Sequence, residues 1–411
     1  MGDGTTSTSY RVGEIGGDGA ADNPKVNNKQ VTIAGSNASA KLDFSAEQFL
    51  FFNDSIILED IQIAWADRVF AEGNTFIVQQ SVVQTGSKEP MFIAGSNAHD
   101  LDKTDLRLYS GTYKKIIGGQ MKNTVGETNV IVGGSVNSGI DTSSHDHTYV
   151  LFGGNYTEGA ACTVTGDTNV TVETGAKFNY VYGAGAKAEN VADSVACAVQ
   201  GETNVTFAGE AYGVYGGACG RLTGSVDKVV TCGNTNLKIV DGANVAQVFG
   251  GSEYASVSGS TNVQLLGGKV TRRVYGGCYN EESPATYYAN GTTIVTVNPA
   301  VTLASTGWFS EVLSAVSRYN VSSSTTETGI YIFNDYTNNS TNIGKIDGYG
   351  DKTHDHIVKV GANGSATVVD GKLVVTPNSG YAASVTGATD NGDGTYTLTA
   401  TEVIVTFSAS N

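Results

Sequence analysis

Residues 201–217 read GETNVTFAGEAYGVYGG, a phrase that recurs along the chain and decides the fold. A turn-like G-E-T-N leads into a short β-branched run, and V-Y-G-G closes the phrase. Five other copies, some of them degenerate, open at Gly126, Gly166, Gly233, Gly259 and Gly291. Successive openings are separated by 40, 35, 32, 26 and 32 residues. Such recurrence is typical of architectures in which repeats stack on one another.

Each repeat consists of short strands, because its runs of four to six residues are rich in Val, Ile, Thr and Tyr. Gly, Asn and Ser separate these runs, which is a pattern of strands and turns and not of helices. A unit this short cannot bury its own apolar face, whereas coils that rest on one another bury a continuous core. The sequence therefore predicts an all-β fold, a right-handed parallel β-helix with coils about 4.8 Å apart.

An asparagine column supports this stacking. The same slot of the phrase holds Asn129, Asn169, Asn204, Asn236 and Asn262. Asparagine tolerates the left-handed backbone of a sharp turn. Its amide can also donate and accept hydrogen bonds from one coil to the next. We interpret this column as structural.

A second column is mostly aromatic and has two interpretations. It holds Ile117, Phe152, Tyr182, Tyr215, Phe249 and Tyr275, each followed by glycine. The rings form the interior of the stack, since one face of every short strand must be buried. Alternatively they form an outward platform for flat ligands such as sugars, in which case Tyr182, Tyr215 and Tyr275 are the candidate binding residues.

Composition excludes several function classes. The formal net charge is −16, with 24 Lys and Arg against 40 Asp and Glu. Nucleic-acid binding requires clusters of Lys and Arg, and docking on anionic lipid requires a basic patch, so we expect neither. No run of 18 apolar residues occurs, so we expect no membrane insertion.

The five cysteines form an odd set without a closed disulfide framework. Cys162 and Cys197 each lie four residues before a repeat-opening glycine, so we expect them to stack on adjacent coils. Buried thiols that fill small core sites are favoured over disulfides.

Three segments are predicted. Residues 1–30 form a leader or cap, and residues 31–350 form the β-helix, with the clearest repeats at 110–300. Within the second segment, residues 308–319 fit either a helix or a degenerate coil of the β-helix, in which Val312 to Ala315 stand in place of V-Y-G-G. Residues 355–411 alternate cleanly and contain the tight turn DNGDG, which predicts a small antiparallel β module.

Two resemblances follow from these motifs. The G-x-T-N-V…V-Y-G-G repeats resemble those of secreted or cell-surface β-helix proteins of Gram-positive anaerobic bacteria. The tail, with VVTPNSGYAASVTGA and GTYTLTATEVIVTF, is similar to small β repeat modules strung along bacterial surface proteins. The resemblances imply an extracellular or cell-surface location, and they say little about activity because β-helices host both enzymes and adhesins.

Two copies of H-D-H are candidate metal sites. His145 and His147 form one pair, and His354 and His356 form the other. Alternate residues of a strand project to the same side, so each pair can present two imidazoles to one ion. Zinc or another divalent metal fits such a pair, and calcium fits the acidic column of Glu127, Asp167 and Glu202. The structural interpretation is that H-D-H only marks a polar loop before a strand.

No catalytic constellation stands out. Paired carboxylates can hydrolyse glycosides, and acids cluster between Asp54 and Glu72, but no pair is singled out by its spacing. A lyase needs a basic residue near calcium-binding acids. The basic doublets Lys114-Lys115 and Arg272-Arg273 are not flanked by an obvious set of acidic residues. G-x-S-x-G and the phosphate loop are absent.

The leading hypothesis is a non-enzymatic adhesin, binding or spacer protein. Its partner is a host glycan or an extracellular protein, contacted by a lateral face of the β-helix. The alternative is a carbohydrate-active β-helix enzyme, either a polysaccharide lyase or a glycoside hydrolase.

Overall fold

The computed structural model describes residues 9–12, 30–37, 39–96, 98–143, 145–192, 194–222, 230–279, 287–304, 313–315, 317, 328–346 and 355–410. The described chain is nearly all β, with 37 strands and one four-residue helix, α1 (Ser340–Ile343). It forms two compact units. The first comprises Met1–Val205, Gly209–Tyr212 and Cys219–Thr231, and the second comprises Thr206–Ala208, Gly213–Ala218 and Cys232–Asn411.

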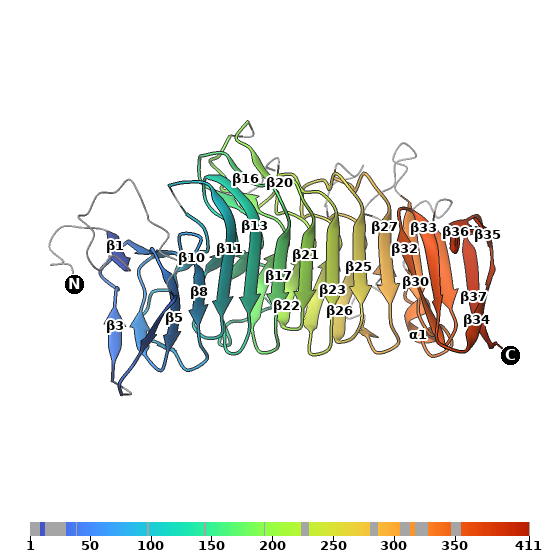
Figure 1. Cartoon of the computed structure of the whole chain (residues 1–411), viewed down its shortest axis with the longest axis horizontal. Helices are drawn as coiled ribbons and strands as arrows, with labels where there is room; N and C mark the ends of the chain where they lie inside the picture. Colours follow the sequence, from blue (N-terminus) through green and yellow to red (C-terminus); the bar gives the residue numbers. More distant parts are fainter. Residues whose placement is uncertain are drawn as a thin grey trace. The chain divides into compact units, whose positions relative to one another are not determined.

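The first unit is built on two rows of parallel strands, of which row B is clearly visible in Figure 1. Row A contains, in spatial order, β1 (Ser9–Val12), β4 (Phe49–Phe52), β7 (Arg68–Phe70), β10 (Met91–Ile93), β12 (Lys115–Ile117), β14 (Val150–Phe152) and β18 (Lys177–Tyr182). Row B contains β2 (Gln30–Ala34), β5 (Ser55–Glu59), β8 (Thr75–Val78), β11 (Leu101–Leu108), β13 (Asn123–Val132) and β17 (Thr168–Val172).

Shorter strands complete the first unit. They are β3 (Lys41–Asp43), β6 (Gln62–Ala64) and β9 (Val83–Gln84) in one sheet, β15 (Tyr156–Thr157) with β19 (Ala186–Lys187), and β16 (Cys162–Val164) with β20 (Cys197–Val199). Cys162 pairs with Cys197 in register, as the sequence predicts. The five cysteines are all described, buried and reduced.

Alternation explains how row B buries its inner face. In β17 the side chains of Thr168, Val170 and Val172 are buried, whereas those of Asn169 and Thr171 are half-buried. The predicted asparagine column is confirmed here, because Asn129 pairs with Asn169 in register. However, both residues lie within strands and not in the left-handed turns that the sequence suggested. The Asn204 amide also donates to Asn169 Oδ1 at 3.2 Å. The Asn169 amide donates instead to Glu127 Oε1 on the preceding strand at 3.0 Å, so the column bonds from strand to strand through carboxylates as well as amides.

The second unit repeats this plan. Its first row contains β23 (Thr235–Ile239), β25 (Thr261–Leu265), β27 (Thr293–Val297), β30 (Gly329–Phe333), β31 (His356–Val360), β37 (Glu402–Ala409) and β34 (Tyr381–Thr386). Its second row contains β24 (Asn244–Phe249) and β26 (Lys269–Tyr275), with β28 (Thr302–Leu303) and β29 (Leu313–Ser314) both paired to β26. Asn236 pairs with Asn262 in register, as predicted. The strands β21 (Thr203–Phe207) and β22 (Glu210–Tyr215) contain residues of both units.

The degenerate-coil interpretation of residues 308–319 agrees with the part that is described, but the register lies one residue later than predicted, since Leu313 and not Val312 takes the place of the repeat valine. Leu313 and Ser314 pair with Val274 and Tyr275, so they occupy the place that V-Y takes in a regular repeat. Trp308 and the other residues of this segment up to position 312 lie outside the described residues.

The tail combines both kinds of pairing. Antiparallel pairs join β34 to β37 and also join the strands of a separate four-stranded sheet, β32 (Gly364–Val369), β33 (Lys372–Pro377), β36 (Thr395–Leu398) and β35 (Ala388–Asp390). However, β31 pairs with β30 and with β37 in parallel. The tail therefore extends the first row of the second unit and shares a core with it, since Val358 and Val403 pack with Ile330 and Ile332.

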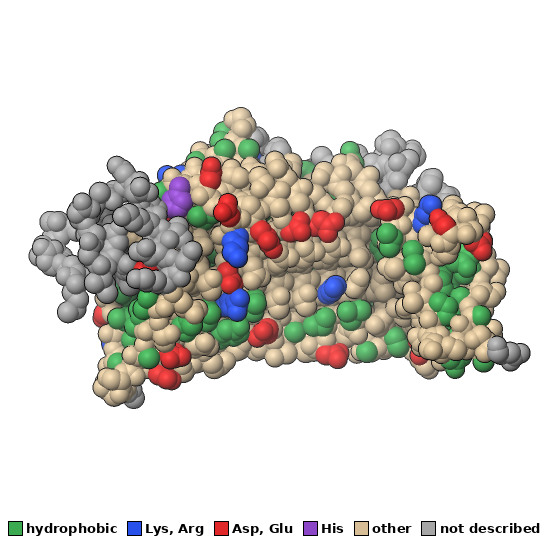
Figure 2. Space-filling view, viewed as in Figure 1, with side chains coloured by type: hydrophobic (Ala, Val, Ile, Leu, Met, Phe, Trp, Pro, Cys, Tyr) green, Lys and Arg blue, Asp and Glu red, His purple; other side chains and the backbone are tan. Residues whose placement is uncertain are grey.

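Figure 2 shows one face of the molecule, on which backbone and uncharged polar side chains (tan) predominate. Acidic side chains (red) are scattered over it with few basic ones (blue), in keeping with the net charge of −16.

Candidate functional site

The outer face of row A carries apolar and cationic side chains side by side. On the inner face, Leu50, Val69, Phe92, Ile116 and Leu151 follow one another in register and are all 0% exposed. The residues one position earlier on the first four of these strands therefore face the other way. These four half-buried side chains, which we call the outer file, are Phe49, Arg68, Met91 and Lys115.

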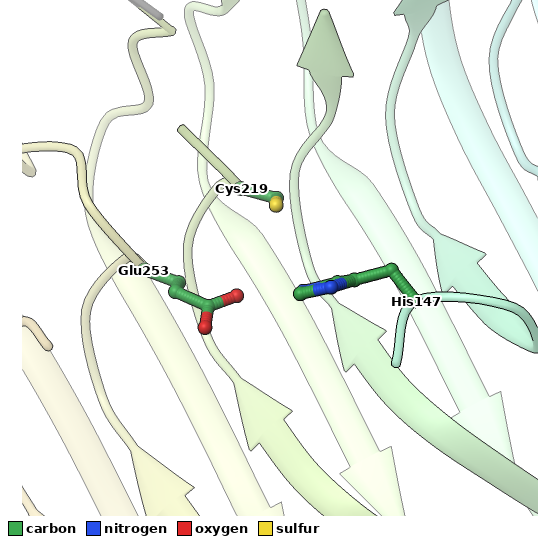
Figure 3. Close-up of side chains that lie close together, drawn as sticks. All are labelled: His147, Cys219 and Glu253. Atoms are coloured by element: carbon green, nitrogen blue, oxygen red, sulfur yellow. The ribbon is translucent and has the colours of Figure 1, made fainter. Parts of the chain in front are cut away.

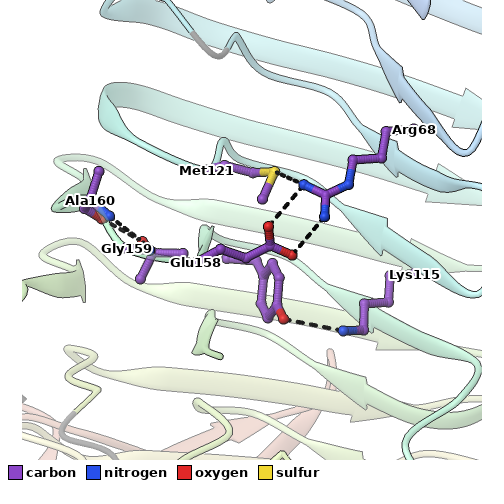
Figure 4. Close-up of polar contacts among 8 residues, drawn as sticks. Arg68, Lys115, Met121, Glu158, Gly159 and Ala160 are labelled. Carbon is purple, nitrogen blue, oxygen red and sulfur yellow. Dashed lines mark hydrogen bonds and ion pairs between the residues drawn. The ribbon is translucent and has the colours of Figure 1, made fainter. Parts of the chain in front are cut away.

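A bidentate ion pair neutralises the Arg68 guanidinium in the outer file (Figure 4). Its Nη1 lies 2.9 Å from Glu158 Oε2, and its Nη2 lies 3.1 Å from Glu158 Oε1. A turn holds Glu158 in place, because the buried Thr157 hydroxyl accepts hydrogen bonds from Gly159 N and Ala160 N, both at 3.1 Å. Both oxygens of the Glu158 carboxylate are therefore committed to arginine.

Lys115 lies beside this pair and contacts an aromatic ring. Its Nζ donates to the Tyr156 hydroxyl at 3.2 Å and lies 4.6 Å from the centroid of the Tyr156 ring. The Tyr156 ring in turn stacks on Phe152, with a centroid distance of 5.9 Å. Among the described residues, no carboxylate lies within ion-pair distance of Lys115 Nζ.

Burial perturbs the protonation of both Lys115 and Tyr156. It lowers the pKa of the Lys115 ammonium, an effect that nearby Glu158 opposes and nearby Arg68 reinforces. Burial also raises the pKa of the Tyr156 hydroxyl to about 12. In both cases loss of hydration disfavours the charged form. Burial therefore disfavours the charged form of Lys115, and nearby Glu158 offsets only part of that effect.

The candidate aromatic residues of the sugar-platform interpretation are largely interior. Tyr182 and Tyr215 are 0% exposed, whereas Tyr275 is half-buried. In the first unit Tyr182 stacks on Phe152 at 5.4 Å. In the second unit Phe249 stacks on Tyr215 at 4.8 Å and on Tyr275 at 5.3 Å. A fully covered ring has no face for a sugar, so Tyr182 and Tyr215 act as core side chains.

The first H-D-H motif places its two imidazoles against tyrosines. The His145 ring lies 4.1 Å from the Tyr212 ring. The His147 ring stacks on Tyr180 at 4.3 Å, and its Nε2 lies 3.0 Å from the Tyr182 hydroxyl. No group of three neighbouring metal-ligand side chains among the described residues includes His145.

Within the first unit, His147 has a close neighbour whose side chain can bind metal. A ring nitrogen of His147 and Cys219 Sγ, both in the first unit, lie within 4.8 Å of each other (Figure 3). No sequence motif pairs these two residues, because 72 positions separate His147 from Cys219. Cys219 is positioned by a parallel bridge to Ala186, which itself pairs with Tyr156. Figure 3 also labels Glu253, a residue of the second unit.

The second H-D-H motif is only partly described. His354 lies outside the described residues. His356 begins β31, and its Nδ1 lies 2.8 Å from the Ala400 carbonyl oxygen. This contact ties β31 to the segment before β37. His356 belongs to no group of three potential metal ligands in the part of the chain that is described.

The acidic column makes structural contacts in the first unit. Asp167 Oδ1 accepts a hydrogen bond from the Glu202 backbone N at 2.8 Å, and Glu127 Oε1 accepts one from the Asn169 amide at 3.0 Å. These carboxylates therefore stabilise the turns that open successive repeats.

Comparisons with known proteins give no assignment, since no family model, curated protein or solved structure matches the chain. In the described part, none of the helical structure has the length and apolar character needed to cross a bilayer.

Proposed function

We propose that this chain is a secreted or surface-displayed β-solenoid that binds glycan or protein without catalysing a reaction. Its two rows of strands per unit are, in this proposal, two faces of a right-handed parallel β-helix. The in-register pairing of equivalent repeat residues supports that architecture. The repeats and the tail support extracellular display through their resemblance to bacterial surface proteins.

The observation that carries the binding role is the outer file of the first unit. It combines an aromatic ring, a thioether and two cationic side chains on one half-buried surface, at Phe49, Arg68, Met91 and Lys115. Phe51, on the same strand as Phe49, is also half-buried and stacks on Phe70 at 4.9 Å. Sugars present apolar ring faces beside polar groups, and such sites combine aromatic walls with a few polar contacts.

An oligosaccharide panel tests this role on the whole chain. We expect retention of at least one oligosaccharide, with no product released from it. The variant Phe49→Ala should weaken that binding, whereas Thr171→Ala on the outer face of row B should not. Equal loss in both variants, or no binding by the wild type, would refute the proposal. Release of shortened or unsaturated sugars would instead establish a carbohydrate-active enzyme.

A further inference from the structure

We propose that Lys115 and Tyr156 form a binding site for the carboxylate of an acidic sugar. This inference rests on the proposed function, because it specifies the class of glycan that the outer file binds. The ligand class is an oligosaccharide that contains a uronic or sialic acid residue.

The first argument is the number of unused donors. An ammonium group carries three N–H donors, and Lys115 uses one of them toward the Tyr156 hydroxyl at 3.2 Å. The Tyr156 oxygen accepts that bond, so its own proton is still available for donation. No acceptor for this proton occurs among the described residues. Two donor atoms of different side chains therefore lie 3.2 Å apart, beside the half-buried Lys115 and the buried Tyr156, and a carboxylate can accept one bond on each oxygen.

The second argument is charge. Arg68 and Glu158 neutralise each other through two hydrogen bonds, which leaves Lys115 as the uncompensated charge of this group. Lys115 is half-buried, so a cation here without a carboxylate partner is unfavourable, and a bound anion reduces that cost. The net charge of the chain is −16, so the protein surface in general does not attract anions. Binding of an anion at this local positive site is therefore selective.

The third argument is position. Lys115 is half-buried and lies in the outer file, so the ammonium is reached from the same surface as Met91 and Phe49. Neighbouring strands of a row are about 4.8 Å apart. The Phe49 ring is therefore three strand spacings from Lys115, within reach of other sugar residues of the same oligosaccharide. The Arg68 guanidinium lies between them, 6.0 Å from the Phe49 centroid.

Lys114 provides a matched control. It is adjacent in sequence to Lys115 and carries the same charge, but its side chain is exposed and does not belong to the outer file. Lys114→Met and Lys115→Met remove the same charge from the protein. A difference between them therefore reports the site and not the net charge.

The test measures binding of four oligosaccharides to the full chain by calorimetry: galacturonate, mannuronate and hyaluronate oligomers, and sialyllactose. Each is compared with its methyl ester, which keeps the sugar and removes the charge. We expect at least one acid to bind and its ester to bind at least about tenfold more weakly, the loss of one charge-assisted hydrogen bond. Lys115→Met and Tyr156→Phe should each weaken binding of the acidic oligosaccharide by at least about threefold to tenfold. Lys114→Met should weaken it by less than about twofold.

Each other outcome overturns the proposal. Equal binding of acid and ester shows that the carboxylate is not recognised, and equal weakening by Lys114→Met and Lys115→Met shows non-specific attraction. If only neutral sugars bind, the carboxylate site is refuted and the proposed function stands. If no sugar binds, both the carboxylate site and the proposed function are refuted. Tyr156→Phe deletes only a hydroxyl, and its thermal unfolding midpoint checks that the fold is retained.

Discussion

The Thr168 hydroxyl donates a hydrogen bond to the Gly183 carbonyl oxygen at 2.6 Å. Thr168 belongs to the T-N pair that opens a repeat, and Gly183 follows the tyrosine that ends β18. The bond thus joins row B to row A across the interior of the first unit. Equivalent bonds join Thr104 to Gly118, Thr128 to Gly153, Thr235 to Gly250 and Thr261 to Gly276, at 2.5 to 2.7 Å.

Replacing Thr168 by valine should destabilise the protein. The hydroxyl is fully buried, and its loss leaves the Gly183 carbonyl without this donor. An unsatisfied buried acceptor costs about 1–3 kcal/mol of unfolding free energy. Thr171→Val, on the half-buried side of the same strand, should change it by less than about 0.5 kcal/mol. Urea unfolding measures both, and equal effects would contradict this role of Thr168.

Gly153→Ala should also be destabilising, for a steric reason. A Cβ at Gly153 would lie 2.4 Å from the Gly183 carbonyl oxygen and 2.6 Å from Val170 Cγ2. Overpacking of this kind costs about 1–3 kcal/mol. A Cβ at Gly159 would have no neighbouring atom within 4 Å, so Gly159→Ala should be close to neutral. A thermal melt of Gly153→Ala that matches the wild type would show that the strands can separate to accept the methyl group.

The sequence predicted those contacts in which one repeat position meets the same position of the next. Asn129 on Asn169 and Cys162 on Cys197 are of this kind, because stacking requires only that the repeats align. The threonine bond was not predicted, because it joins two different positions 15 residues apart. The contact between Lys115 and Tyr156 was even harder to predict from the sequence. Lys115 and Tyr156 are 41 residues apart, and their contact depends on the length of the insertion between them.

Tyrosine truncation separates core rings from surface rings. Tyr182 is 0% exposed, so Tyr182→Ala should cost about 3–5 kcal/mol, as for other large buried side chains. Tyr275 is half-buried, so Tyr275→Ala should cost clearly less. The urea midpoints of the two variants provide the comparison. A Tyr182 variant as stable as the wild type would show that this ring does not support the core.

Lys115 should make stability depend on pH in the alkaline range. Unfolded lysine titrates near pH 10.4, and burial lowers the pKa of Lys115 in the folded chain. Between these two values the unfolded chain binds more protons than the folded chain, so stability rises with pH. The rise should be present in the wild type and absent in Lys115→Met.

The comparison should stop near pH 10, because Tyr156 acts in the opposite direction above it. Its pKa of about 12 in the folded chain exceeds the unfolded value near 10. The unfolded chain therefore loses the phenolic proton first, and stability falls as pH increases further. Thermal midpoints measured at intervals of pH, with Lys115→Met beside the wild type, give the difference. Parallel curves for the two proteins would show that Lys115 keeps an ordinary pKa.

Oxidation should join Cys162 to Cys197 once the thiols become accessible. Their Sγ atoms are 3.6 Å apart, on strands paired in register. Paired strands place Cα atoms about 5 Å apart, within the range of about 4.4–6.8 Å found in disulfides. The hydrogen bond that the Cys162 thiol donates to Cys197 Sγ, together with burial, raises the pKa of Cys162, so the reaction should be slow in the native state. Diamide accepts two electrons and two protons as the two thiols form one S–S bond.

In mild denaturant, peptide mapping should find the Cys162–Cys197 link first, and Cys197→Ser should abolish it. A first link between any other two cysteines would mean that the paired register of β16 and β20 is not kept during opening.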